Sequence, residues 1–229
     1  IDAAIRKTGV HPGVFSLIQS NGIEVGQALV QHPLIKAVGF TGSLGAGRAL
    51  FDLCAARDEP IPFFGELGSV NPMFLLPQAM KARGTDIAKG WAGSLTMGAG
   101  QFCTNPGIAV VQDGTEAEDF ARQAAASLKE VDAQTMLTDG IASAYRKGVE
   151  RVSGETGVRE LLTSTCDLRN ATPYLYEVSG GDWVENHVLA EEVFGPMGII
   201  VKAKDAAQVE AIARSLEGQL TCTIHMDDG

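Results

Sequence analysis

The sequence predicts an α/β fold in which a parallel sheet is covered by helices on both faces. Short apolar runs of strand length alternate along the chain with segments of helical periodicity, which is typical of βαβ units. The longest runs, Ile108–Val111 and Met197–Val201, are strand-sized and far shorter than a membrane span. Hydrophobic residues make up 45% of the 229 residues and charged residues 20%, which is typical of a globular protein with its own core.

The first part of the chain predicts three strands and three helices. Gly9 is expected to end the first helix and Pro33 the second, because proline cannot continue a helix and glycine commonly follows one. Ser43 can cap the third helix. The predicted strands cover residues 14–19, 36–40 and 61–65, and the predicted helices cover residues 1–7, 24–32 and 44–56.

After Glu66 the same alternation continues with a different composition. The change near residues 67–71 predicts a domain boundary there, with domains at 1–68 and 69–229. The predicted strands of the second domain cover residues 72–76, 107–112, 172–178, 197–201 and 220–225, and its predicted helices cover residues 86–98, 116–129, 141–151 and 206–216.

Charge and cysteine content narrow the class of protein. The net charge is −10 and the pI is about 4.8, which argues against a protein that grips nucleic acid through its overall field. The four cysteines lie far apart, with no C-x-x-C pair and no histidine at zinc spacing, so we expect free thiols in a reducing cytoplasm and no metal. The chain starts within a predicted helix and without a signal-peptide pattern, so we expect it to be part of a longer protein.

The first candidate site is the turn between a predicted strand and a predicted helix, at residues 40–47. Gly42 lets an anion approach the backbone, Ser43 adds a hydroxyl donor, and the N–H groups at a helix start favour negative charge. The glycines do not follow the G-x-G-x-x-G pattern, and no lysine follows them as in a Walker loop. An ordinary turn with a serine cap is the commoner explanation of this local pattern.

The second candidate is Cys103, which lies among small residues between a predicted helix and a predicted strand. The thiolate is the nucleophilic form of cysteine, and backbone N–H groups around it can hold an oxyanion. Most free cysteines are buried and inert, so spacing alone leaves a structural role open. A structural role is favoured for the other three, with Cys54 on the apolar face of a helix, Cys166 in a polar loop and Cys222 in a core strand.

Acidic residues supply the third and fourth candidates. Glu66 ends an apolar strand, where partial desolvation of the carboxylate suits a general base. Glu191 and Glu192 precede an aromatic residue and a Gly-Pro turn, and such a pair of acids can hold the two hydroxyls of a sugar. Taken one at a time, each of these acids is more simply explained as a solvated surface residue.

Taken together, the candidates form an ordered series, which is far more specific than any single motif. In chain order the motifs are Phe-Thr-Gly-Ser at 40–43, Glu-Leu-Gly at 66–68, Gly-Gln-Phe-Cys at 100–103 and Glu-Glu-Val-Phe-Gly-Pro at 191–196.

This series resembles the aldehyde dehydrogenase superfamily over the whole chain. The fuller strings around Glu66 and Cys103 look like the branch that contains α-ketoglutarate semialdehyde dehydrogenases and NADP-dependent fatty aldehyde dehydrogenases. Most of the superfamily has Gly-Lys where this chain has Ser69 and Val70, and that departure supports the branch.

The resemblance implies an aldehyde dehydrogenase-like fold of three αβα layers, in which part of a Rossmann-like nucleotide domain precedes an α/β catalytic domain. It implies that Cys103 is the nucleophile that attacks an aldehyde, and that Glu66 activates the water that hydrolyses the resulting thioester. The family's asparagine that helps to hold the oxyanion would lie before residue 1.

The resemblance also implies NAD or NADP as the cofactor, with NADP favoured by the branch alone. The matching positions are Gly42 and Ser43 at the pyrophosphate turn, Leu67 and Gly68 beside the nicotinamide, Glu192 on the nicotinamide ribose, and Phe194 packed beside it.

The expected activity is the oxidation of a small aldehyde, with α-ketoglutarate semialdehyde first and a long-chain fatty aldehyde as the alternative. We expect a homo-oligomer that binds neither nucleic acid nor membranes. Arg122, Arg146 and Arg159 are candidates for binding a substrate carboxylate, although each is predicted on a solvated surface. An inactive folded fragment is the alternative from another class. A cysteine hydrolase is weaker, because no motif ties a histidine to Cys103.

Overall fold

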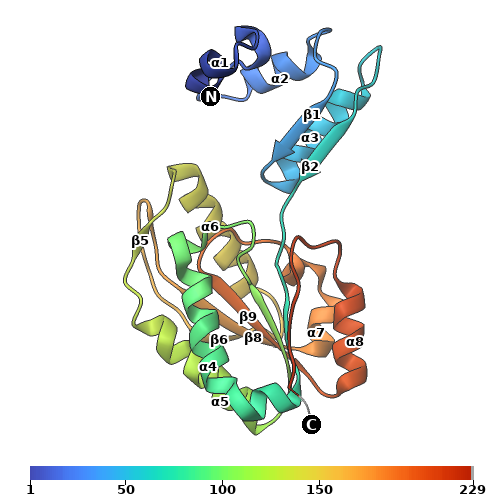
Figure 1. Ribbon diagram of the computed structural model, residues 1–229. Coiled ribbons are helices and arrows are strands. Elements are labelled where there is room, and N and C mark those ends of the chain that lie inside the picture. Colours follow the sequence, from blue (N-terminus) through green and yellow to red (C-terminus); the bar gives the residue numbers. More distant parts are fainter. Residues whose placement is uncertain (228–229) are drawn as a thin grey trace. The chain divides into compact units, whose positions relative to one another are not determined.

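A computed structural model describes residues 1–227, and the chain divides into two compact units, Ile1–Leu67 and Gly68–Gly229 (Figure 1). In unit 1, strands β1 and β2 pair in parallel, with Val38 opposite Phe63 and Thr41 opposite Glu66. Helix α3 connects the two strands, as expected of a βαβ unit. The elements of unit 1 are α1 (Asp2–Thr8), η1 (Pro12–Val14), α2 (Glu24–Gln31), β1 (Val38–Thr41), α3 (Leu44–Ala55) and β2 (Phe63–Glu66).

The strand predicted at 14–19 is wrong. Residues 12–14 form a short 3₁₀ helix and residues 15–20 form neither helix nor strand. Leu17 is 72% exposed, so the apolar residues of this segment are not packed. A strand requires a hydrogen-bonded neighbour, and among residues 1–227 this segment has none.

The predicted cap of α3 is confirmed. The side chain of Ser43 accepts a hydrogen bond from the backbone N–H of Ala46 at 3.3 Å, which satisfies one donor of the first helical turn. Cys54 lies on the inner face of the same helix and is buried, as expected.

Unit 2 is built on a six-stranded sheet with the order β10-β3-β4-β9-β8-β6. All neighbouring strands are parallel except β6, which pairs antiparallel with β8. A separate two-stranded sheet joins β5 to β7. The strands are β3 (Met73–Leu75), β4 (Ile108–Gln112), β5 (Gln134–Thr135), β6 (Arg159–Leu162), β7 (Asn170–Ala171), β8 (Tyr174–Ser179), β9 (Met197–Ala203) and β10 (Thr223–His225).

Helices cover both faces of this sheet (Figure 1). Ile108 and Val110 of β4 pack into the core with α6, α7 and α8, whereas Ala109 and Val111 pack into the core with α4 and α5. Because both faces are buried, β4 is an unbroken apolar run rather than an alternating one. The predicted three-layer α/β architecture is confirmed. The helices are α4 (Pro77–Thr96), η2 (Met97–Gly100), α5 (Thr115–Lys129), α6 (Asp139–Ser153), α7 (Gly180–Glu185), η3 (His187–Ala190) and α8 (Ala206–Ser215).

Two expectations for unit 2 need correction. Helix α4 starts at Pro77, whereas the sequence predicted a start at residue 86. Between these two positions, the non-helical backbone of Arg83 (φ −149°, ψ 22°) interrupts the helical periodicity. Cys222 is exposed and precedes β10, so its assignment to a core strand is wrong. The reason is that β10 is the edge strand of the sheet and its residues are poorly covered.

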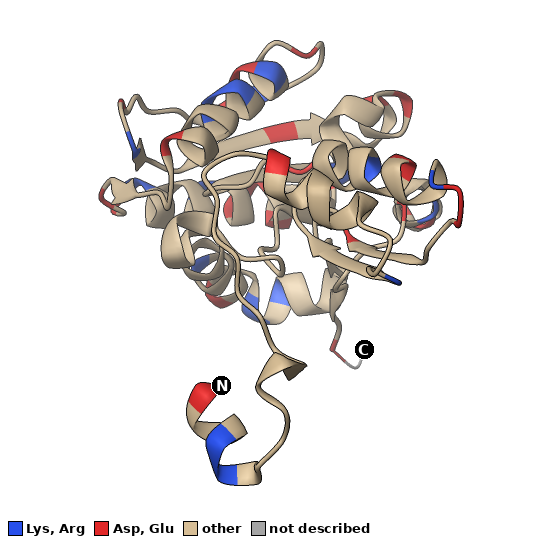
Figure 2. Cartoon of the chain, turned by 90° about the horizontal axis from the view of Figure 1, so that it is seen from above, with Lys and Arg blue, Asp and Glu red and all other residues tan. Residues whose placement is uncertain are grey.

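Charged residues of both signs share the same outer helices (Figure 2). Helix α5 carries Glu116 and Glu118 in its first turn and Lys129 in its last, an arrangement that favours the helix dipole. None of the helices in the described part of the chain combines the length and apolar character needed to cross a membrane.

Candidate active site

Four loops of unit 2 lie at the amino-terminal edge of its sheet, and the predicted residues Gly68, Cys103, Glu192 and Phe194 lie in or next to three of them. Each loop precedes a parallel strand, and these strands are neighbours in the order β10-β3-β4-β9, so their first residues lie side by side. The loops are 69–72 before β3, 101–107 before β4, 191–196 before β9 and 216–222 before β10. Strand order thus gathers segments that are far apart in the sequence.

The loop of Cys103 begins with a reversal of the backbone. Gly98, Ala99 and Gly100 all have left-handed dihedrals, with φ of 57°, 57° and 68°. Ala99 is unusual among these three residues, because residues with a side chain rarely adopt left-handed dihedrals. Its N–H donates to Oε1 of Gln134 at 2.6 Å, a bond that helps to hold the turn. The thiol of Cys103 follows this turn and is exposed to solvent.

Glycine is required at position 100. A Cβ built there would lie 2.3 Å from the backbone carbon of Gly195, which is closer than any real side chain allows. Two backbones therefore touch directly at this point. The side-chain amide of Asn105 bridges them, donating to the carbonyl of Gly100 at 2.8 Å and to that of Gly195 at 3.2 Å. This contact fixes the Cys103 loop against the segment that carries Glu192 and Phe194.

A buried tyrosine supports the same segment from the other side. The ring of Tyr145 on α6 lies where a Cβ on Gly195 would be, at 2.2 Å from the built position. The Tyr145 hydroxyl donates to the carbonyl of Thr172 at 2.7 Å. Burial raises the pKa of Tyr145, so the phenol stays a neutral donor. Val193 packs against Gly148 one turn further along α6.

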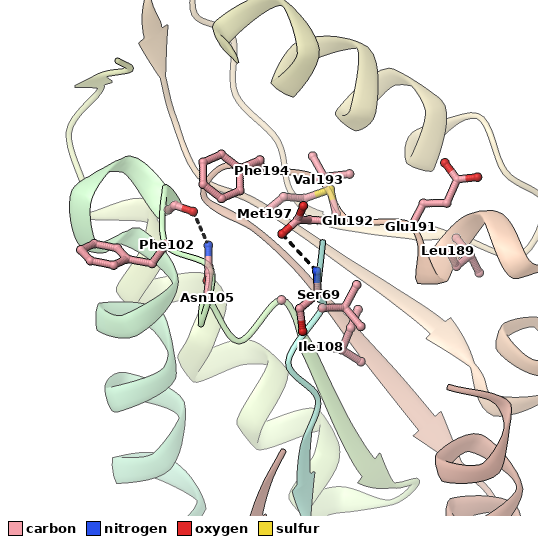
Figure 3. Close-up of a pocket in the computed structure, with 13 residues that line it drawn as sticks. Ser69, Phe102, Asn105, Ile108, Leu189, Glu191, Glu192, Val193, Phe194 and Met197 are labelled. Carbon is pink, nitrogen blue, oxygen red and sulfur yellow. Dashed lines mark hydrogen bonds between the residues drawn. The ribbon is translucent and has the colours of Figure 1, made fainter. Parts of the chain in front are cut away.

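Glu192 is a half-buried carboxylate in this segment. Its Oε1 accepts a hydrogen bond from the backbone N–H of Ser69 at 3.3 Å, and Oε2 has no partner within residues 1–227 (Figure 3). Burial raises the pKa of Glu192, and the Ser69 N–H offsets this in part by stabilising the anion. Gly68 has φ +97°, and a Cβ there would lie 3.1 Å from Oε2. Glycine thus keeps this side of the carboxylate open.

A small cavity of about 20 Å³ opens between these loops (Figure 3). Glu192 and Phe194 line it from one segment, and Ser69, Phe102 and Asn105 line it from the others. A space of that size holds about one water molecule. It is therefore a niche beside Glu192 and not by itself a complete substrate site. The structure brings Gly68, Glu192, Phe194 and the loop of Cys103 together within unit 2.

The predicted residues of unit 1 also meet at one place, the carboxyl ends of β1 and β2. The N–H of Gly42 donates to the carbonyl of Glu66 at 3.1 Å, so the two motifs are joined directly. Leu67 packs on α3 at Gly47, where a Cβ would lie 1.9 Å from its Cδ2. Carboxyl ends of parallel strands are the usual place for ligands in open α/β sheets.

The expected desolvation of Glu66 is not observed. The side chain is exposed, as are the two residues before it in β2. In unit 1, β2 pairs with β1 alone. The sequence pattern of an apolar strand that ends in an acid therefore did not predict the solvent exposure of that acid.

The three candidate arginines are engaged elsewhere. Arg122 pairs with Asp119 on the surface of α5. Arg146 donates to the carbonyl of Leu168 at 2.7 Å. Arg159 lies on strand β6, rather than in a helix or loop, and donates to Glu177 at 2.7 Å. None of the three lines the cavity beside Glu192.

Fold and site together define an α/β protein with an exposed thiol and a half-buried carboxylate on adjoining loops. The aldehyde dehydrogenase family profile matches residues 1–228, and the chain belongs to the aldehyde dehydrogenase family.

Two curated relatives are α-ketoglutaric semialdehyde dehydrogenases. α-Ketoglutaric semialdehyde dehydrogenase 2 of Azospirillum brasilense is 44% identical over 232 residues, and the match covers 99% of this chain and 44% of that protein. The enzyme of Acinetobacter baylyi is 37% identical, covering 100% of this chain and 44% of that protein. The chain thus spans less than half the length of these relatives.

Solved structures share the fold at low identity. An NAD-dependent benzaldehyde dehydrogenase from Corynebacterium glutamicum matches with a TM-score of 0.82 at 22% identity, covering 99% of this chain and 50% of that one. A 1-pyrroline-5-carboxylate dehydrogenase matches with a TM-score of 0.81 at 19% identity, covering 99% and 45%. The predicted aldehyde dehydrogenase-like fold is confirmed.

The half-buried carboxyl of Glu192 predicts a pH-dependent effect of Glu192→Gln. The carboxyl of Glu192 has a higher pKa in the folded protein than in the unfolded chain. Ionisation of Glu192 therefore destabilises the fold as the pH rises through the folded-state pKa. Relative to wild type, the variant should gain stability as the pH rises above about 4, where the carboxyl of the unfolded chain ionises. Urea unfolding followed by Trp91 and Trp183, both buried in unit 2, measures this.

Glu191→Gln is the matched control for this measurement. Glu191 is exposed and pairs with Arg151 at 3.1 Å, so its loss should change stability by less than about 1 kcal/mol. A Glu192→Gln variant that loses stability relative to wild type as the pH rises would contradict the role of burial.

Proposed function

We propose that the protein containing this chain is an NAD(P)-dependent aldehyde dehydrogenase that oxidises an aldehyde to a carboxylate. The observation that carries the proposal is the exposed thiol of Cys103, on a loop whose backbone is held by Asn105, in a member of this family. Unit 1 supplies the second half of the dinucleotide-binding domain in this proposal, and unit 2 supplies most of the catalytic domain. We further expect the whole protein to form a homo-oligomer.

In the proposed reaction, Cys103 is the nucleophile. Its Sγ bonds to the carbonyl carbon, the carbonyl oxygen becomes an oxyanion, and the N–H of Cys103 donates to it. A bound NAD(P)⁺ would supply the acceptor for the hydride on the former carbonyl carbon, and loss of this hydride, with the C=O bond re-formed, leaves a thioester on Sγ of Cys103. Glu66 then takes a proton from water, whose oxygen attacks the acyl carbon and breaks its bond to Sγ. The carboxylate leaves and the thiolate of Cys103 is restored.

Two places in the chain support the proposed binding of a dinucleotide. In unit 1, Gly42 and Ser43 precede the first turn of α3, where backbone N–H groups favour a phosphate. In unit 2, Oε2 of Glu192 is available to accept from a ribose hydroxyl, and Gly68 keeps the approach open. Leu67 and Phe194 complete the proposed cofactor site. NADP is favoured over NAD by the resemblance to its branch.

We propose α-ketoglutarate semialdehyde as the substrate, because two relatives carry that name at 44% and 37% identity. Its carboxylate needs a cation or several hydrogen-bond donors near Cys103. Arg122, Arg146 and Arg159 are engaged with other groups of unit 2, so we expect this partner to come from elsewhere in the protein.

Cys103 should react with iodoacetamide faster than the other three thiols, because Cys54 is buried and Cys166 is half-buried. Cys222 is also exposed and is therefore the informative comparison. In the full-length protein, Cys103→Ala should abolish turnover while Cys222→Ala keeps it. Faster labelling of Cys222, or turnover by Cys103→Ala, would show that the nucleophile is misassigned.

Glu66→Gln should slow hydrolysis of the thioester more than its formation. Loss of a general base typically lowers the rate by about 10²–10⁴. A rapid burst of reduced cofactor should therefore persist while steady-state turnover falls, which stopped-flow absorbance measures. If the burst disappears while hydrolysis is intact, Glu66 acts in the first half-reaction instead.

The substrate assignment is tested by kcat/KM on a five-carbon semialdehyde acid and on a long unbranched aldehyde. A charged recognition group left unpaired costs several kcal/mol, so the acid should be preferred by about 10²-fold or more. A preference of that size for the long aldehyde refutes the substrate and leaves the reaction class intact.

A further inference from the structure

Asn71 connects the Cys103 loop to the rest of the amino-terminal edge. The residue is only 2% exposed and has a left-handed backbone, with φ 47°, which asparagine tolerates better than most residues. Its Nδ2 donates to the backbone carbonyls of Cys103 and Asn105, both at 2.9 Å. Its Oδ1 accepts from the N–H of Thr221 at 3.2 Å and from the Thr221 hydroxyl at 2.9 Å.

Gln219 holds the backbone of Asn71 in turn. Its Oε1 accepts from the N–H of Val70 at 2.8 Å and from the N–H of Asn71 at 3.1 Å. The hydroxyl of Ser69 accepts from the N–H of Leu220 at 3.0 Å. Several hydrogen bonds therefore join two segments about 150 residues apart, and no pattern in the sequence predicts them.

The bonds of Asn71 act on the peptide group next to the nucleophile. The carbonyl of Cys103 and the N–H of Thr104 share one plane, and fixing that carbonyl fixes one end of the Cys103 backbone. Asn105 is held twice, through its carbonyl by Asn71 and through its side chain on Gly100. The loop from 100 to 105 is thus restrained at both ends.

We infer that Asn71, supported by Gln219, is a positioning residue that sets the direction from which the thiol of Cys103 attacks. The inference rests on the proposed function of Cys103. The same segment donates to Glu192 through the N–H of Ser69. One short stretch of chain therefore orients both the nucleophile and the carboxylate of Glu192, which is proposed to bind the cofactor. A misplacement of about 1 Å at a reacting group can lower a rate by about 10²-fold.

Asn71→Asp is the sharpest variant. It keeps an oxygen to accept from Thr221 but replaces the donating amide by an oxygen that faces the carbonyls of Cys103 and Asn105. In the full-length protein, burst formation should slow by about 10- to 100-fold. The KM for the cofactor should change much less, because Glu192 and its Ser69 partner are retained.

A second readout needs neither cofactor nor substrate. Amide hydrogen exchange in the peptide that spans 100–106 should speed up in Asn71→Asp, while exchange in strand β9 stays as in wild type. Gln123→Glu is the matched amide-to-acid control, because the half-buried Gln123 amide on α5 donates to Ser127 and not to the Cys103 loop, so this variant should change neither exchange in that loop nor rate. If wild type has no dehydrogenase activity but the exchange effect is present, the proposed function fails and the restraint of the loop stands.

Gln219 variants cover the case in which Asn71→Asp does not fold. Gln219→Leu leaves Asn71 in place and removes the acceptor for its N–H, so it should also slow the burst and loosen the loop. Gln219→Glu keeps that acceptor, so its burst rate and loop exchange should be closer to those of wild type than to those of Gln219→Leu. Loop exchange and burst rates equal to those of the control in both Asn71→Asp and Gln219→Leu would overturn the inference.

Discussion

The direct contact between the backbones of Gly100 and Gly195 is the constraint on which the site depends. A Cβ on Gly100 would overlap the backbone of Gly195, and a Cβ on Gly195 would overlap the ring of Tyr145, so space restricts both positions to glycine. The left-handed backbone of Gly100 adds a conformational restriction at that position. The left-handed turn at 98–100 directs the chain toward this contact. The side chain of Asn105 bridges the carbonyls of the two glycines, and Tyr145 of α6 packs against Gly195 on the other side. A shift of either loop would therefore move Cys103 relative to Glu192.

The site is held together mainly by neutral side-chain amides. Loops that pack on one another bury N–H and carbonyl groups that no strand ladder satisfies, and leaving such groups unpaired is costly. Asn71, Asn105, Gln134 and Gln219 each meet this need, because an amide offers donors and an acceptor without a charge. Among the residues that line the cavity, only Glu191 and Glu192 carry a charge, and of these two only Glu192 is half-buried.

The two units place their candidate residues at opposite ends of their strands. In unit 1 the residues follow β1 and β2, where the start of α3 offers free backbone donors for an anion. In unit 2 they precede β3, β4 and β9, where loops of irregular conformation can present a thiol and a carboxylate. The proposed function would use both arrangements, since a helix N-terminus favours a phosphate and a nucleophilic thiol must be accessible to its substrate.

The sequence by itself determined the alternation of strands and helices, the cap at Ser43, the buried run of β4 and the ordered motifs that mark the family, because these depend on residues close in the chain. It failed at 14–19 and at Cys222, where the presence or absence of neighbouring elements decides. Only the tertiary structure decided that Asn71, Tyr145 and Gln219 serve the Cys103 loop. Their hydrogen bonds join segments that are distant in sequence but are brought together by the order of the strands, and strand order is not encoded in any local pattern.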